Sequence, residues 1–331
     1  MSHAFEIEAV DHIEIATRDL LLTEQLYHKL GFETLTTRTL SERSLQSKLL
    51  GQNNVYIILS QSTDPNDAVS KYVTAHGEGI LSVTLRTKDA FSMLEYVHSR
   101  GAKVVTSPKT ILKDYGEVTV ATIASVGSTQ IHFLSREGQL FLEGFDYALK
   151  PAHKGYGLTS FDHFSMVVPK DSLFEYTKFL SHVLGMEEIS YGTSSPHKIY
   201  LKYKNFHIVL NEPETPDSEQ AKFIEAHHGA GFDHIAFGTN DIIASINDIQ
   251  KSQIPFKKAS HTFYEDLLVK RPDLSSKIPE LSKLNIVSHG TQEEGLLQAA
   301  TLYLHGYNYF EFVERHHFEW LGTAVKNILK D

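Results

Sequence analysis

Three stretches of the first half of the chain recur, in the same order, in its second half. VDHIE at residues 10–14 recurs as FDHFS at 161–165, GILS at 79–82 recurs as GFDH at 231–234, and IHFLSR at 131–136 recurs as FEFVER at 310–315. Matches over such a distance that keep one internal order indicate an internal duplication. The fold should therefore be built from two related halves.

Each half contains two smaller units, and each unit is typical of a strand, a helix and then further strands. In the first half, the pattern predicts strands at residues 10–15, 44–60 and 80–86, helices at 20–30 and 89–100, and further strands up to residue 136. In the second half, it predicts strands at 161–168, 188–210, 233–238, 296–304 and 309–315, helices at 172–184 and 241–251, and a partly helical insert at 259–295.

Four tandem βαβββ units predict an α+β fold in which two open-barrel halves each curl around a cavity. We expect the halves to be residues 1–150 and 151–331, joined by a linker at residues 138–158 that contains Lys150-Pro151 and two nearby glycines. A plain α+β domain without a cavity is the alternative.

Composition excludes several classes of protein. The 331 residues are 41% hydrophobic and 22% charged, as expected for a globular protein of two domains. A formal charge of -10 without a basic stripe argues against nucleic acid as a partner. The chain has no cysteine, so any metal must be bound by His, Asp or Glu. The N-terminus does not resemble a signal sequence and no apolar run approaches the length of a membrane span, so we expect a cytoplasmic protein without a membrane partner.

The repeat places three metal-binding residue types on equivalent strands of the second half: His163, His234 and Glu311. Neighbouring residues of a strand face opposite ways, so Asp162 and Asp233 should face away from the cavity or support the backbone. Glu311 lies between two phenylalanines, where a buried carboxylate needs a cation or another partner. Two histidines and one carboxylate leave coordination positions of a metal open for chemistry.

The same positions in the first half hold His12, Ser82 and His132. These residues could bind a second metal weakly, or they are remnants of the duplication that now serve packing or hydrogen bonding. A lone histidine on a strand is more often structural than a ligand, and the chain has 19 histidines. The pattern of three, and not any single histidine, indicates the metal site.

In their order along the chain, several segments resemble the 4-hydroxyphenylpyruvate dioxygenase family of the vicinal-oxygen-chelate superfamily. They are FDH at 161–163, LG at 184–185, LNEP at 210–213, GAGFDHIA at 229–236, LLQ at 296–298 and FEFVER at 310–315. The resemblance covers nearly the whole chain. It implies a fold like that of glyoxalase, bleomycin-resistance protein and dihydroxybiphenyl dioxygenase.

The resemblance also implies an activity. His163, His234 and Glu311 would bind Fe(II), and 4-hydroxyphenylpyruvate and O2 would be converted to homogentisate and CO2, a reaction of tyrosine catabolism. Asn211 and Gln298 match positions that line the substrate pocket of the family. Tyr309 and Ser165 are each two residues from an expected ligand and should share its face. Asp233, where the family usually has Gln, should also contact the substrate.

Other departures from the family concern the walls of the pocket. A family serine falls at Pro196, with Ser194 and Ser195 close by, and a family phenylalanine is replaced by Ala300. The glycine-rich stretch before the C-terminal gating helix is missing, and we expect a short helix ending near Lys330. On this helix Phe318, Trp320 or Leu321 would replace the aromatic lid.

Three alternative functions remain open at this stage. The chain could resemble hydroxymandelate synthase, or use a different 2-oxo acid. It could be an extradiol dioxygenase, although the expected signature around Glu311 is not found. It could also be a metal-free binding protein of the same superfamily, which would have no need of the three ligands. A homo-oligomer is compatible with the sequence, which indicates no interface.

Overall fold

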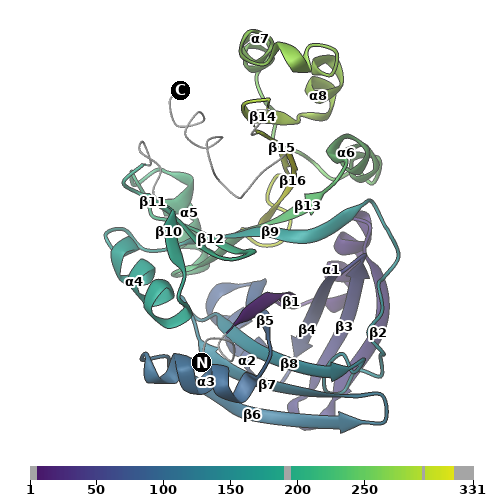
Figure 1. The fold of residues 1–331 in the computed structure, drawn as a ribbon, viewed down its shortest axis with the longest axis vertical. Coiled ribbons are helices and arrows are strands. Elements are labelled where there is room, and N and C mark those ends of the chain that lie inside the picture. The colour runs from purple at the N-terminus through teal and green to yellow at the C-terminus, as the bar shows by residue number, and fades with distance from the viewer. Residues whose placement is uncertain (1–5, 190–194, 293–294, 317–331) are drawn as a thin grey trace.

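Two eight-stranded sheets form the two halves of the molecule (Figure 1). The computed structural model describes residues 6–189, 195–292 and 295–316. The first half contains β1 (Ile7–Ala16), α1 (Leu20–Lys29), β2 (Glu33–Leu40), β3 (Leu45–Gln52), β4 (Val55–Ser62), α2 (Ala68–His76), β5 (Gly79–Thr87), α3 (Ala90–Ser99), β6 (Val104–Lys113), β7 (Gly116–Ala124) and β8 (Gln130–Gly138).

The second half repeats this series and adds helices before its last three strands. It contains β9 (Leu158–Val167), α4 (Leu173–Leu184), β10 (Glu187–Ile189), β11 (Lys198–Tyr203), β12 (Phe206–Asn211), α5 (Glu219–His227), β13 (Gly231–Thr239), α6 (Ile242–Lys251), α7 (His261–Lys270), α8 (Ile278–Leu284), β14 (Val287–Gly290), β15 (Gly295–Ala300) and β16 (Tyr309–His316). Short 3-10 helices lie at Ser41–Arg43 and Pro272–Leu274.

The two sheets have the same topology. Their strand orders are β2-β3-β4-β1-β5-β8-β7-β6 and β10-β11-β12-β9-β13-β16-β15-β14. In the first sheet, the central strands β1 and β5 are antiparallel to each other, and they run parallel to β4 and β8, respectively. The second sheet repeats this with β9 and β13 at its centre and with β12 and β16 beside them. The duplicated βαβββ architecture predicted from the sequence is confirmed, and the insert at residues 259–295 is partly helical as expected.

Local sequence explains where the unit helices begin and end. Asp19, Asp89 and Asp241 each accept a hydrogen bond from a backbone N–H of the first turn of the helix that follows. Helix α4 ends at Gly185, whose φ of 70° lies in the left-handed region that glycine adopts without strain. Helices α2 and α5, which join the two units within each half, were not expected from the sequence.

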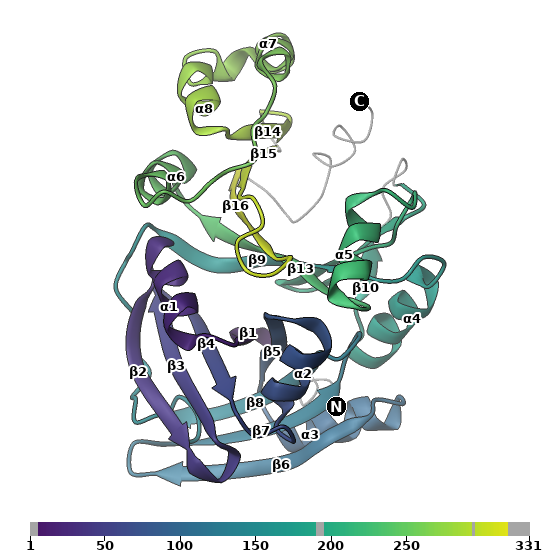
Figure 2. The ribbon, with the colours of Figure 1, turned by 180° about the vertical axis from the view of Figure 1, so that it is seen from behind.

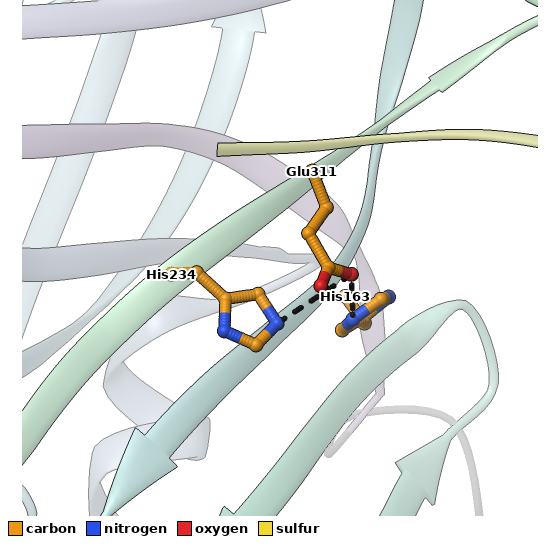
Figure 3. Close-up of side chains that lie close together, drawn as sticks. All are labelled: His163, His234 and Glu311. Atoms are coloured by element: carbon orange, nitrogen blue, oxygen red, sulfur yellow. Dashed lines mark ion pairs between the residues drawn. The ribbon is translucent and has the colours of Figure 1, made fainter. Parts of the chain in front are cut away.

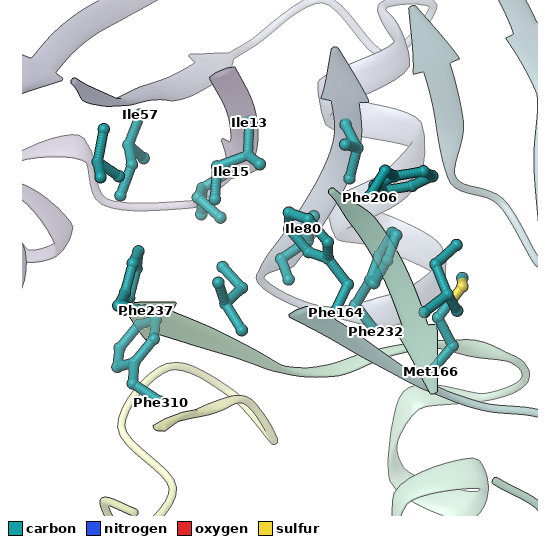
Figure 4. Close-up of a cluster of buried hydrophobic side chains, with 14 of the residues drawn as sticks. Ile13, Ile15, Ile57, Ile80, Phe164, Met166, Phe206, Phe232, Phe237 and Phe310 are labelled. Atoms are coloured by element: carbon teal, nitrogen blue, oxygen red, sulfur yellow. The ribbon is translucent and has the colours of Figure 1, made fainter. Parts of the chain in front are cut away.

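Alternation along the central strands gives each sheet two different faces. On β1, His12 and Glu14 line a cavity, while Ile13 and Ile15 belong to a hydrophobic core. The second half contributes aromatic residues to the same core, among them Phe164 (Figure 4). The halves therefore share one core between them, and each keeps its own cavity on the opposite face of its sheet.

The expected linker is well anchored. Phe141 and Phe145 are buried against the first half, and the Tyr56 hydroxyl donates a hydrogen bond to the carbonyl oxygen of Lys150. The part of the linker before residue 150 thus packs on the first half. The expected gating helix, with Phe318, Trp320 and Leu321, lies outside the described residues, as does Ser194. Within the described parts of the chain, no helix has the length and apolar character needed to cross a bilayer.

Candidate metal centre and substrate pocket

Strand register brings the three expected ligands together on the three central strands of the second sheet. Ala236 of β13 pairs with His163 of β9 on one side and with Glu311 of β16 on the other. His234 lies two residues before Ala236 and pairs with Ser165 and Tyr309. Because residues two apart on a strand share a face, His163, His234 and Glu311 all point to the same side of the sheet.

The side chains converge on one point (Figure 3). Nε2 of His163 lies 3.5 Å from Glu311 Oε2, and Nε2 of His234 lies 3.7 Å from the same oxygen. One ligand atom from each of the three residues lies within 4.8 Å of the others. Among the described residues, no other group of three or more ligand-type side chains lies close enough together to hold a metal ion.

Both histidines are oriented by the aspartate that precedes them. Nδ1 of His163 donates to Asp162 Oδ1 at 2.8 Å, and Nδ1 of His234 donates to Asp233 Oδ2 at 3.1 Å. Each pair leaves Nε2 directed at Glu311. A carboxylate on the second ring nitrogen is the usual support of a histidine that binds a metal.

Strict strand alternation would not allow these contacts, and β-bulges explain them. The pairing between β9 and β13 passes over Asp162 and Asp233, so each is an extra residue at a register shift. A bulge re-aims the side chain next to it. The expectation that Asp233 faces away from the cavity is wrong, because Asp233 lines it beside His234.

Asp162 also forms a two-bond ion pair with Arg315, at 2.7 Å and 2.6 Å. The first half has the same arrangement, in which Asp11 pairs with Arg136 and accepts a hydrogen bond from Nδ1 of His12. The duplication has therefore preserved the supporting contacts in both halves. The complete set of three ligands belongs to the second half alone among the described residues.

Burial and charge act in opposite directions on the ligands. Burial alone would lower the pKa of His163, but hydrogen bonds and charges from Asp162 and Glu311 raise it to about 9. Burial alone would raise the pKa of Glu311, but the charge of His234 and the hydrogen bond to His163 lower it to about 2. The carboxylate is thus anionic at neutral pH, and a metal would replace the proton that His163 holds beside it.

The donor set fits a divalent first-row metal. Two imidazoles and one carboxylate with open positions beside them are typical of non-haem Fe(II) sites. The buried carboxylates behind both histidines and the anionic Glu311 match this chemistry. The chain has no cysteine that would select a softer metal environment.

A cavity of about 240 Å³ lies over the three residues. All five residues expected to contact the substrate line it, namely Ser165, Asn211, Asp233, Gln298 and Tyr309. Several further polar residues of its wall were not predicted from the sequence, namely Lys198, Tyr200, Gln220, His289 and Arg315. Those on strands could have been found only from the register of β11, β14 and β16, which the sequence does not specify.

Contacts within the cavity hold the expected pocket residues in place. Asn211 Nδ2 donates to the Ser165 hydroxyl at 2.9 Å. The Tyr309 ring stacks on His234 with 4.5 Å between ring centres, and the Lys257 ammonium lies 3.9 Å from the centre of the same tyrosine ring. These contacts orient the cavity wall next to the expected ligands.

The departures from the family pattern have a clear location. Ala300 pairs with Glu311 across β15 and β16, so the small side chain lies beside the expected ligand. Pro196 is exposed and is not part of the cavity wall. In the first half, His12 Nε2 and His132 Nε2 form hydrogen bonds with Thr84 and Gln130, at 3.1 Å and 3.3 Å.

Comparisons with known proteins agree with the fold. The profile of hydroxyphenylpyruvate dioxygenase N-terminal domains matches residues 3–146, and that of the glyoxalase/bleomycin resistance protein/dioxygenase superfamily matches residues 160–270. The 4-hydroxyphenylpyruvate dioxygenase of Pseudomonas aeruginosa is 26% identical over 88% of this chain and 82% of its own. The enzyme of the same name from Dictyostelium discoideum is 25% identical over 96% of this chain and 95% of its own.

Among solved structures, a variant of 4-hydroxymandelate synthase from Streptomyces coelicolor superposes with a TM-score of 0.82 at 21% identity, covering 98% of both chains. The fold and the site thus define a two-half protein of the vicinal-oxygen-chelate class. In sequence, the chain is similar to the 4-hydroxyphenylpyruvate dioxygenase family, as a divergent relative.

Proposed function

We propose that this protein is a non-haem Fe(II) dioxygenase that converts 4-hydroxyphenylpyruvate and O2 to homogentisate and CO2. The observation that carries the proposal is the convergence of His163, His234 and Glu311 within 4.8 Å beneath a polar cavity, in a chain similar to this family. These three residues would hold the metal. When bound, Fe(II) supplies the electrons that activate O2 for oxidative decarboxylation of the 2-oxo acid and hydroxylation of the product.

The protein's own contribution is orientation and charge. Asp162 and Asp233 hold the Nδ1 protons of His163 and His234, so that both Nε2 atoms remain available to the metal. The anionic Glu311 completes a face with room for a bidentate 2-oxo acid and O2. The three residues lie on three adjacent strands, and the hydrogen bonds between these strands fix their relative positions.

The cavity wall provides groups suited to a 2-oxo acid. Lys198 lies in the wall, where its ammonium attracts a carboxylate. Asn211 is fixed by its hydrogen bond to Ser165, which leaves the amide oxygen to accept a hydrogen bond from the substrate. Gln298 can donate or accept from the opposite strand, β15.

Oxygen uptake by the Fe(II)-loaded protein tests the proposal. We expect 4-hydroxyphenylpyruvate to stimulate uptake, and Glu311→Ala to abolish both uptake and retention of iron. The matched control is Glu225→Gln, which changes an exposed carboxylate on α5 and should behave as the original protein. If no member of a panel of 2-oxo acids raises uptake above the level of Glu311→Ala, the proposal fails.

A second candidate is formation of 4-hydroxymandelate from the same substrate. Ala300 favours it, because a small residue beside Glu311 replaces the family phenylalanine that would sandwich the ring. The structural similarity to 4-hydroxymandelate synthase is consistent with both reactions. Homogentisate and 4-hydroxymandelate are isomers, so mass alone does not separate them. Chromatography against both standards, or the ring-proton pattern by NMR, decides between them.

We further propose that the reaction takes place in the cytoplasm, as a step of tyrosine catabolism. Cells that lack the protein should then accumulate 4-hydroxyphenylpyruvate in their soluble fraction when supplied with tyrosine. Unchanged 4-hydroxyphenylpyruvate levels would contradict this assignment.

We also propose that the protein forms a homo-oligomer. Sedimentation of the purified protein tests this proposal.

A further inference from the structure

The first half has its own cavity, with a volume of about 280 Å³ against about 240 Å³ in the second half. Its walls come from the curved first sheet, including the outermost strands β2 and β6, and from residues 142–143, which follow β8. Neither the family resemblance nor the proposed reaction assigns a role to this space. All of its lining residues belong to the described part of the chain.

This cavity does not repeat the metal chemistry of the second half. His12 and His132 take the positions of His163 and Glu311, but Ser82 takes the position of His234. Among the described residues, three ligand-type side chains come within metal-binding distance of one another in the second half and not in this cavity. Burial lowers the pKa of His132 to about 4, so this imidazole is neutral at physiological pH.

Much of the wall is apolar. Aliphatic side chains from several strands and from the segment after β8 face the space, among them Leu40, Ile58, Leu81, Val120 and Leu142. Removing apolar ligand surface from water against such a wall is favourable by about 25 cal/mol per Å². The cavity therefore suits a molecule with an apolar body.

One buried cation in the wall lacks a close anionic partner. The Arg38 side chain is 7% exposed, and the nearest carboxylate recorded for it among the described residues is Glu14, at 3.9 Å. Its other contacts are hydrogen bonds of 3.2 Å to the neutral oxygens of Ser47 and of the Glu143 backbone, and a cation–π contact in which the guanidinium carbon lies 4.4 Å from the centre of the Phe145 ring. Nε is buried and has no hydrogen-bond partner in the described structure.

The other cations of this wall are already paired with carboxylates, and the Glu14 carboxylate accepts a hydrogen bond from the Ser60 hydroxyl. Lys109 pairs with Glu143 at 2.7 Å, and Arg43 pairs with Asp67 at 2.7 Å. Burial lowers the pKa of Arg38 in spite of the charge of Glu14, which shows that the nearby carboxylates do not fully compensate for its desolvation. By contrast, the arginines that support the histidines have bidentate carboxylate partners.

We propose that the cavity of the first half is a second binding site, for a small carboxylic acid with an apolar body. The carboxylate would contact the Arg38 guanidinium, and the apolar body would lie against the aliphatic side chains that face it. This site is separate from the cavity over His163, His234 and Glu311. The proposal does not depend on the proposed dioxygenase reaction.

Calorimetric titration of the full chain with octanoate tests this site, with 1-octanol as the uncharged probe of equal chain length. We expect octanoate to bind with a stoichiometry of one. Arg38→Met, which removes the charge and keeps the length, should weaken octanoate binding at least tenfold and leave octanol binding unchanged. Arg86→Met is the matched control, because Arg86 is an exposed arginine on β5 of the same half.

A second variant keeps the arginine and fills the space. Val120→Phe should abolish binding of both probes, and circular dichroism establishes whether each variant is folded. Glu311→Ala should bind octanoate as the original protein does, which separates this site from the metal centre. Absence of octanoate binding at millimolar concentration would overturn the proposal, as would equal affinity in the original protein and in a folded Arg38→Met or Val120→Phe variant.

Discussion

At the scale of single residues, Asp162 shows how a bulge lets a strand residue support a neighbouring histidine of the proposed metal site. It contacts His163 and Arg315 at once, and its repeat counterpart Asp11 makes the same contacts with His12 and Arg136. The two aspartates therefore have matched surroundings and differ in what lies beyond the histidine. This duplication provides an internal control that few metal sites offer.

Replacing Asp162 by Asn should lower metal affinity by about 10- to 100-fold, the usual effect of removing a carboxylate that supports a ligand histidine. Asp11→Asn should leave metal affinity unchanged. Both variants lose a buried ion pair and should be destabilised by about 3 kcal/mol. Titration with Co(II) gives the affinities, and urea unfolding gives the stabilities. Equal loss of affinity in the two variants would show that the effect is one of general stability.

Lys198 is the second residue with a distinct expected effect. Removal of a hydrogen bond to a charged group costs about 1.5 kcal/mol, so Lys198→Met should raise KM for the 2-oxo acid about tenfold and change kcat little. Steady-state oxygen uptake measures both constants. Lys222→Met, at an exposed position of α5, is the control. A fall in kcat at constant KM would argue against a role of Lys198 in substrate binding.

The residues of the site differ in how far the sequence revealed them. His163, His234 and Glu311 could be selected because the duplication aligns three strands and gives ligand types at each. Asp233 was misplaced with respect to its strand face, because a bulge depends on how two strands pair and leaves no mark in the alternation of either strand. Lys198 and His289 were missed because their positions over the cavity depend on the register of β11 and β14, which the sequence does not specify.

At the scale of elements, the repeat predicted the four unit helices well, because each has a capping aspartate or a terminal glycine in the sequence. Helices α2 and α5 were missed although both have capping side chains, Asp67 and Ser218. They are 9 residues long, so the 3.6-residue period extends over only about two and a half turns. Both helices lie on the same side of the molecule (Figure 2).

The contact between α2 and α5 joins the two halves through buried polar groups. The Tyr72 hydroxyl lies 3.2 Å from Nε2 of His227, and Nδ1 of His227 donates to the Gly229 carbonyl oxygen at 3.1 Å. The ring of His76 stacks on that of His227 with 4.5 Å between centres. Burial, together with the charges of neighbouring histidines, lowers the pKa of His227 to about 4.

This pKa predicts a loss of stability in acid. The unfolded chain binds a proton at His227 near pH 6.5, whereas the folded chain binds it only near pH 4, so unfolding becomes easier as pH falls through this window. The full effect of such a shift is about 3 kcal/mol. The unfolding free energy of His227→Gln should therefore fall less between pH 6.5 and pH 4 than that of the original protein. His261→Gln, at an exposed histidine, is the control. Parallel curves of unfolding free energy against pH for the His227 variant and the original protein would contradict the prediction.

At the scale of the whole molecule, the first half supports the site without contributing a ligand. Tyr27 of α1 packs against Phe310 with 5.6 Å between ring centres, and Phe310 immediately precedes Glu311. Phe32 packs against Phe237 in the same way, at 5.8 Å. The sequence predicted two halves. It could not predict that the sheet faces opposite the two cavities pack on each other as one core, because a buried face has the same apolar pattern whichever partner covers it.

A shared core predicts that metal binding stabilises both halves together. A ligand that binds only the folded state adds about 2.7 kcal/mol at a free concentration 100 times its dissociation constant. Calorimetric unfolding with increasing Ni(II), which is stable to oxidation, should thus show a single transition that moves to higher temperature as a whole. Glu311→Gln should show no such shift, and Glu225→Gln should shift like the original protein. If the halves were independent, two transitions would appear and only the one from the second half would move, since the proposed metal ligands His163, His234 and Glu311 all lie there. A single shifting transition would mean that substitutions in the first-half core lower the temperature at which the metal centre itself unfolds, because the two halves then unfold as one unit.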